Sequence, residues 1–292
     1  MKVLITGGSG NLGRYVVEEV KSRGHEVAVF DAKEPRDKSV KFIKGDLLKL
    51  ADLENACKGI EAIIHLGAIA NPTLAEHEVV FNVNVMGTYN ALEAAMKNKV
   101  RRFVLASSDS TLGFLFRASP PLMPQYLPID EDHPLEAEDP YGLSKKVDEE
   151  VCLMFTRRYG IETVCLRICF VWFPDEFRYG DNVGSPENYR GLTQNADVWG
   201  PGLWVYQDAR DAAQAFRLGA ETPGIKHERI YISADESGTN VDSLKLIEKY
   251  YPSVKKVDKA KLKGRASLIC CDKAKKILGY KPKYSWQDLF NK

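Results

Sequence analysis

The chain has 292 residues, 44% of them apolar, and its 41 basic and 40 acidic side chains leave a net charge of +1. This length suits one large domain or two smaller ones, and the near-zero charge gives no electrostatic basis for a nucleic-acid or membrane partner. No apolar run reaches the roughly 18 residues that a membrane-spanning helix needs. The first strand begins at once, without a secretory h-region, and the six cysteines follow no disulfide or metal-binding spacing, which predicts a cytoplasmic protein without a metal site.

Strand and helix patterns alternate over the first 170 residues. Six apolar runs are predicted as strands: KVLITG (2–7), HEVAVFD (25–31), VKFIKGDL (40–47), EAIIHLGA (61–68), RRFVLASS (101–108) and IETVCLRICFV (161–171). Helices are expected directly after the first run, over 76–98, and after Asp139, which can cap a helix that starts at Pro140. In this last helix the predicted core-facing stripe is Leu143, Val147, Val151 and Phe155. The alternation predicts an α/β fold, a doubly wound parallel sheet with helices on both faces.

The pattern changes after residue 170. Residues 171–204 are rich in aromatic residues, glycine, proline and asparagine and show no sustained period, which is typical of a functional loop region. Regular structure is expected again as a helix over 208–218, a strand over 228–233 and a helical C-terminal region. We therefore predict a large domain formed by 1–170 with 205–234, and a small C-terminal substrate-binding lobe formed by 171–204 with 235–292.

A glycine-rich loop, TGGSGNLG (6–13), lies between the first strand and the first helix. Glycines in such a loop allow a tight turn, a close approach of the backbone to a pyrophosphate, and close packing of helix on strand. Asp31 ends the second strand about 20 residues further on, where an acid accepts the ribose hydroxyls of NAD and disfavours a 2′-phosphate. The sequence therefore predicts a Rossmann domain that binds NAD in preference to NADP. The predicted cofactor contacts are Gly7, Gly10, Asn11, Leu12, Gly13 and Asp31.

A tyrosine and a lysine one helical turn apart are the candidate reactive groups. Tyr141 and Lys145, in YGLSK, lie at i and i+4 near the start of a helix, so they share one face. A neighbouring ammonium lowers the pKa of a phenol, which otherwise lies near 10, and so makes it a usable base. Ser108 lies at the end of the fifth strand, where ligands of such folds bind, and can hydrogen-bond a substrate oxygen.

Several segments together resemble the extended short-chain dehydrogenase/reductase family, the NAD-dependent epimerase/dehydratase group. They match in order and spacing over nearly the whole chain: TGGSGNLG, GDL (45–47), HLGA (65–68), NVNVMGT (82–88), SSDSTLG (107–113), YGLSK (141–145), YQDARDAAQAF (206–216) and DKAKKILGYKPKYSW (272–286). The resemblance implies that Tyr141 is the catalytic base and also contacts the cofactor, that Lys145 is its partner and a ribose ligand, and that Ser108 positions the substrate.

The same resemblance implies further cofactor contacts. Asp46 and Leu47 would flank the adenine, and the residues lining the cofactor channel would be Leu66, Gly67, Ala68 and Asn84. His65 would have a structural role. Helices such as 76–98 and 140–159 form dimer interfaces in this family, which implies a homodimer.

The substrate class is less sharply defined. About thirty residues separate Pro174 from the YQD segment, which is short for a nucleotide-binding lobe and favours a smaller sugar substrate. In the similar hexuronate dehydrogenases, the arginine that binds the substrate carboxylate lies in a segment resembling PENYRGL, which nominates Arg190; the alternative is a surface pair with Glu187. Asp109 stands where that subgroup has asparagine, and Ala70 where it has serine. An acid near the pocket favours a neutral aldose instead, with Asp109 as a hydroxyl acceptor.

We expect an NAD-dependent dehydrogenase that acts on a free sugar or sugar acid. Two other functions remain open: a nucleotide-sugar 4-epimerase that uses the same residues, and a non-catalytic NAD-sensing protein. The aromatic residues Trp172, Phe173, Phe177, Tyr179 and Trp204 can stack on a sugar face, or pack within the small lobe.

Overall fold

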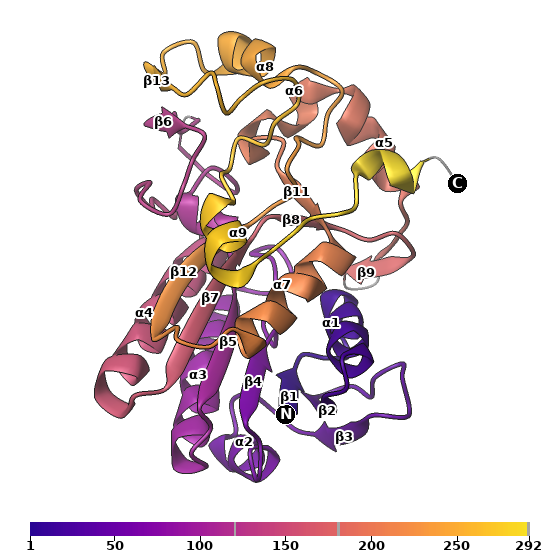
Figure 1. The fold of residues 1–292 in the computed structure, drawn as a ribbon, viewed down its shortest axis with the longest axis vertical. Helices are drawn as coiled ribbons and strands as arrows, with labels where there is room; N and C mark the ends of the chain where they lie inside the picture. The colour runs from indigo at the N-terminus through magenta and orange to yellow at the C-terminus, as the bar shows by residue number, and fades with distance from the viewer. Residues whose placement is uncertain (120, 180–181, 291–292) are drawn as a thin grey trace.

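The computed structural model describes residues 1–119, 121–179 and 182–290 (Figure 1). Within this part of the chain, seven parallel strands form one sheet in the order β12-β7-β5-β4-β1-β2-β3. These strands are β1 (Lys2–Thr6), β2 (Glu26–Asp31), β3 (Lys41–Lys44), β4 (Ala62–His65), β5 (Arg102–Ser108), β7 (Glu162–Ile168) and β12 (His227–Ile232). The predicted doubly wound fold is confirmed.

Helices cover both faces of this sheet. They are α1 (Asn11–Ser22), α2 (Leu50–Ala56), α3 (His77–Lys97), α4 (Pro140–Tyr159), α7 (Ala209–Glu221) and α9 (Asp272–Leu278). The alternation of side chains along β1 separates two cores: Val3 and Ile5 pack with α1, α7 and α9, and Leu4 packs with α2, α3 and α4. From β1, strands β2 and β3 are added on one side of the sheet, and β4, β5, β7 and β12 on the other. The strand order therefore reverses between β1 and β4, and a ligand crevice is expected outside the carboxyl ends of these two strands.

Short elements lie beyond the carboxyl ends of the strands (Figure 1). They are η1 (Asp109–Leu112), β6 (Tyr126–Leu127), β8 (Phe170–Trp172), β9 (Phe177–Tyr179), β10 (Asn182–Gly184), α5 (Glu187–Gln194), α6 (Ala196–Trp199), η2 (Gly200–Gly202), β11 (Tyr206–Asp208), α8 (Ser243–Tyr250), β13 (Lys256–Val257) and η3 (Trp286–Leu289). Their apolar side chains share a third core, which joins residues of the 169–206 region to residues of the last fifty positions.

The predicted sixth strand, 161–171, is divided in two. β7 ends at Ile168 in the large sheet, whereas β8 leaves it and pairs in parallel with β11. The apolar residues continue from β7 into β8, so the sequence pattern carries no signal for this break.

Helix α4 reverses one prediction. Leu143, which we expected in the core, is 43% exposed, and Val147 and Val151 are only half-buried, whereas Phe155 is buried as expected. The inward face is instead largely polar, with Tyr141, Ser144, Lys145, Asp148 and Glu149 all buried. The prediction was wrong because the buried face of α4 carries charged side chains, Lys145, Asp148 and Glu149, which are stabilised by ion pairs inside the protein.

Among the described residues, no helix is both long enough and apolar enough to cross a membrane. The same residues contain no group of three histidine, cysteine or acidic side chains that could hold a metal ion. The six cysteines are free thiols, and five of them are buried.

Candidate active site

The glycine loop lies so close to neighbouring backbone that Gly7 and Gly13 leave no room for a side chain. Gly7 has a φ of +70°, and a Cβ atom at this position would lie 2.7 Å from the Gly67 nitrogen. A Cβ at Gly13 would lie 2.3 Å from the Gly7 oxygen, so α1 can pack against the loop only with glycine there. Gly10 is the N-cap residue of α1 and supplies no side-chain acceptor to the first turn. This end of α1 therefore fits the pyrophosphate of a dinucleotide, which its N–H groups and helix dipole would hold.

The predicted ribose ligand, Asp31, lies beside this loop. Its carboxylate accepts hydrogen bonds from the Ser9 and Lys33 amides, both at 3.1 Å. These bonds fix the orientation of the carboxylate at the end of β2, where the ribose of NAD is expected.

The predicted adenine-flanking residues follow β3. The Asp46 carboxylate accepts a hydrogen bond from the Leu48 amide at 3.0 Å. Leu47 packs against two glycines, since a Cβ at Gly67 would lie 2.9 Å from its Cδ1 atom and one at Gly87 would lie 3.2 Å from its Cβ atom. This close packing places Leu47 next to the loop that follows β4, so two predicted sides of the cofactor channel meet.

Asn84 connects the loop after β4 to α4. Its amide exchanges hydrogen bonds with the backbone of Ile69, at 2.8 and 3.1 Å, and donates to the Ser144 hydroxyl at 2.9 Å. The loop carries the other predicted channel residues, Leu66, Gly67 and Ala68. Asn84 is fully buried, so it holds this loop against the helix that carries Tyr141.

His65 is buried at the end of β4, and its ring hydrogen-bonds the Thr6 hydroxyl at 2.8 Å. The Thr6 hydroxyl in turn accepts a bond from the Gly67 amide at 3.2 Å. Burial, with a smaller effect of Lys145, lowers the pKa of the His65 ring to about 3. The ring is therefore neutral near pH 7, and its contacts fit the structural role that we expected.

The candidate reactive groups, Tyr141 and Lys145, lie near the start of α4. Asp139 caps this helix as predicted, accepting hydrogen bonds from the Tyr141 and Gly142 amides at 2.9 Å. Tyr141 is 8% exposed and Lys145 3% exposed, and the Lys145 Nζ atom lies 5.9 Å from the centre of the Tyr141 ring. The ammonium is thus close enough to stabilise a phenolate on Tyr141.

Gly142, which we did not single out from the sequence, lets α4 approach the end of β5. A Cβ at this position would lie 2.5 Å from the Ser110 oxygen, in the η1 turn that follows Ser108. The Ser108 hydroxyl accepts a bond from the Ser110 amide at 3.1 Å, which fixes the position of its oxygen. Glycine directly after the tyrosine therefore lets α4 pack closely against the turn that follows the candidate substrate-positioning serine.

Asp109 follows Ser108, and its Oδ1 atom accepts a hydrogen bond from the Ser108 hydroxyl, with an O–O distance of 3.2 Å. Burial raises the pKa of the Asp109 carboxyl to about 7, although the hydrogen bonds from Ser108 and Ser110 oppose the shift. The carboxyl is therefore largely protonated at mildly acidic pH and largely ionised at alkaline pH.

Arg190 lies on α5, and its guanidinium binds the Glu187 carboxylate at 2.8 and 3.3 Å and stacks over the Phe290 ring at 4.7 Å. Its side chain is 47% exposed. The structure thus gives Arg190 the surface pair that we considered as the alternative, and does not bring it into contact with Tyr141 or Ser108.

The aromatic residues of this region pack with one another. Trp172, Phe173, Phe177 and Trp204 are all buried, and Trp172 stacks on Tyr189 with ring centres 4.6 Å apart. The side chain of Tyr179 lies outside the described part. The four buried aromatic side chains belong to the core rather than to a sugar-binding face.

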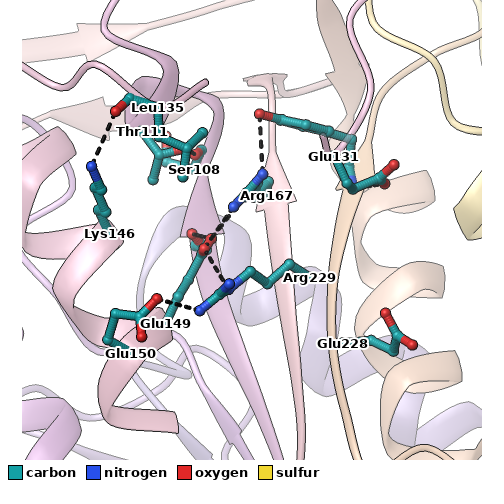
Figure 2. Close-up of polar contacts among 12 residues, drawn as sticks. Ser108, Thr111, Glu131, Leu135, Lys146, Glu149, Glu150, Arg167, Glu228 and Arg229 are labelled. Carbon is teal, nitrogen blue, oxygen red and sulfur yellow. Dashed lines mark hydrogen bonds and ion pairs between the residues drawn. The ribbon is translucent and has the colours of Figure 1, made fainter. Parts of the chain in front are cut away.

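A buried charge network, which we did not predict, lies behind Ser108 (Figure 2). Glu149 on α4 binds Arg167 of β7 through two hydrogen bonds of 2.8 and 2.9 Å, and both side chains are at most 2% exposed. Glu149 also accepts the Ser107 hydroxyl hydrogen at 2.6 Å and lies 3.2 Å from the Arg229 guanidinium. An arginine inside the apolar strand 162–168 was the available signal for this network. It joins α4 to β5 and β7 directly below the site.

The sheet order, the glycine loop at α1 and the tyrosine–lysine pair at α4 define a short-chain dehydrogenase/reductase of the extended type. A model of the NAD dependent epimerase/dehydratase family matches residues 3–229. The chain belongs to this family, and it is an NAD-dependent enzyme.

Three known proteins illustrate what the chain is similar to. A uronate dehydrogenase of Pseudomonas putida is 31% identical over 242 residues, which cover 80% of this chain and 76% of that protein. A putative UDP-glucose 4-epimerase of Methanocaldococcus jannaschii is 33% identical over 178 residues, and the match spans 58% of this chain and 56% of that protein. A short-chain dehydrogenase/reductase superfamily protein of Agrobacterium tumefaciens, solved with bound NAD, superposes with a TM-score of 0.73 at 24% identity over 99% of this chain and 94% of its own, which shows the shared fold.

Proposed function

We propose that this protein is an NAD-dependent dehydrogenase that oxidises a hydroxyl group of a free sugar or sugar acid. The observation that carries the proposal is the buried Tyr141–Lys145 pair, held at the end of β5 by the close contact between Gly142 and η1. Similarity to a uronate dehydrogenase over four-fifths of the chain supports a sugar substrate without a nucleotide.

The chain's own residues supply the proton chemistry. NAD, when bound, accepts the hydride from the carbon that bears the hydroxyl. Ser108 orients the hydroxyl oxygen, and Tyr141 removes its proton. The Lys145 ammonium stabilises the phenolate form of Tyr141, which becomes a neutral phenol when it takes the proton. The carboxylate of Asp31 would bind the ribose of NAD.

A nucleotide-sugar 4-epimerase is the second candidate, and the similarity to a putative UDP-glucose 4-epimerase favours it. An epimerase returns the hydride to its product, so it yields no net NADH. Absorbance at 340 nm should therefore be followed with NAD and a panel of aldoses, uronates and UDP-sugars. We expect net NADH with a free aldose or uronate. Interconversion of UDP-sugars without net NADH would replace this proposal by the second one.

Asp109 and Arg190 are proposed to determine whether the substrate is a uronate or a neutral aldose. Arg190 binds a substrate carboxylate only if its guanidinium leaves Glu187. If it does so, Arg190→Lys should lower kcat/KM for glucuronate or galacturonate by about tenfold or more, because lysine cannot reproduce the two-pronged contact. The matching neutral aldose should show a much smaller loss. Glu187→Gln is the matched control, since it frees Arg190 and should favour the uronate.

The pH dependence separates the contribution of Asp109. Because the pKa of Asp109 is raised to about 7, its negative charge appears as the pH rises through 7. The unmodified enzyme should then lose kcat/KM for the uronate relative to the aldose, and Asp109→Asn should abolish this loss. For Arg190, an equal effect of Arg190→Lys on kcat/KM for the uronate and for the aldose would mean that Arg190 does not bind the substrate carboxylate.

The homodimer and the cytoplasmic location also belong to the proposal. The apolar stripe of α4 faces outwards at Leu143, and α3 exposes Val79, Met86 and Tyr89. The two helices pack side by side (Figure 1). A second copy that covers these two helices would remove this apolar surface from water. Free thiols are typical of a reducing compartment, which supports the cytoplasm.

A further inference from the structure

Two consecutive carboxylates on α4, Asp148 and Glu149, are buried but have different partners. Glu149 is neutralised by Arg167 and Arg229 (Figure 2). Asp148 is 0% exposed, and its Oδ2 atom lies 3.4 Å from the Lys145 Nζ atom. Within the described residues, its Oδ1 atom accepts no hydrogen bond. The charge of Asp148 is therefore compensated by the same lysine that faces Tyr141.

Among the described residues, Lys145 is the only cation next to Asp148. Glu149 lies next to it on α4, and the Thr88 hydroxyl faces it from α3. His65 of β4 faces Lys145 from the sheet and is neutral near pH 7, because burial lowers its pKa to about 3. Burial also raises the pKa of Asp148 to about 6, so the carboxylate is charged in the range in which Tyr141 would act.

A carboxylate this close to an ammonium cancels much of the field that the ammonium exerts on a third group. The third group here is the Tyr141 phenol, whose ring centre lies 5.9 Å from the Lys145 Nζ atom. We propose that Asp148 is a positioning residue that holds Lys145 and, by the charge it places beside the ammonium, sets the pH at which Tyr141 becomes a base. This proposal rests on the role of Tyr141 in the proposed function.

The test is the titration of Tyr141 in the protein without substrate or NAD. The phenolate absorbance of each protein is followed against pH, and the same titration of its Tyr141→Phe version is subtracted. Asp148→Asn leaves the ammonium uncompensated, so the Tyr141 titration should move down by about one pH unit or more. The acid limb of kcat/KM should move in the same direction. Glu150→Gln removes a charge from the exposed side of the same helix and should move neither.

The readouts separate this inference from the proposed function. If no sugar is oxidised, the phenolate titration still decides whether Asp148 acts on Tyr141. If Asp148→Asn does not fold, Asp148→Ser removes the same charge with less bulk, and the two neutral variants should agree. An unchanged or upward-shifted titration would overturn the proposal. So would failure of both variants to fold, because Asp148 would then serve stability alone.

Discussion

Tyr141→Phe is expected to lower kcat by about a hundredfold or more and to leave NAD binding unchanged. The change removes only the phenol oxygen, so the ring that packs at the start of α4 stays in place. Without that oxygen, the proposed acceptor of the substrate's hydroxyl proton is lost. NAD binding is measured by quenching of tryptophan fluorescence, and turnover by absorbance at 340 nm.

Tyr89→Phe is the matched control, because it removes a phenol from a partly exposed position on α3. Its kcat should equal that of the unmodified protein. Turnover of Tyr141→Phe within a factor of a few of the unmodified value would show that another group carries the proton.

Arg167→Met is expected to lower the free energy of unfolding by about 3 kcal/mol or more, because it leaves the buried Glu149 carboxylate without its two-bond partner. Arg229, at 3.2 Å, compensates only part of this charge. The free energy is measured by urea unfolding followed by circular dichroism.

The double variant Glu149→Leu with Arg167→Met removes both charges and should recover much of the loss, since well-packed apolar residues replace buried ion pairs with little cost. Lys97→Met breaks an exposed pair with Glu54 and should leave the unfolding midpoint unchanged. A small loss in Arg167→Met that the double variant does not reduce would mean that the network contributes little to folding.

The parts of the fold that were predictable from the sequence have local causes. The glycine loop, the cap at Asp139 and the apolar strands each depend on residues within one turn or one strand. The same holds for Tyr141 and Lys145, whose spacing alone places them on one helix face. Ser108 was predictable because the carboxyl ends of parallel strands are where such folds bind ligands.

The remaining features depend on contacts between distant residues. The short helices and strands of the 171–204 region have no period of their own, and aromatic packing such as that between Trp172 and Trp199, with ring centres 5.3 Å apart, stabilises them. Asp148 and Glu149 face inwards because they pair with Lys145 on the same helix and with Arg167 on β7. Polar residues in a helix ordinarily face solvent, so the sequence pattern favoured the opposite face of α4.

The inward face of α4 has a consequence for how such an enzyme diversifies. Tyr141, Lys145, Asp148 and Glu149 occupy two turns, and each is bound to a partner inside the protein, so few substitutions on this face preserve function. Helix α5 lies on a separate segment that follows β10, where Arg190 contacts Glu187 and Phe290. If Arg190 recognises the substrate as proposed, mutations on α5 can change which sugar is accepted while the proton chemistry proposed for Tyr141 stays intact.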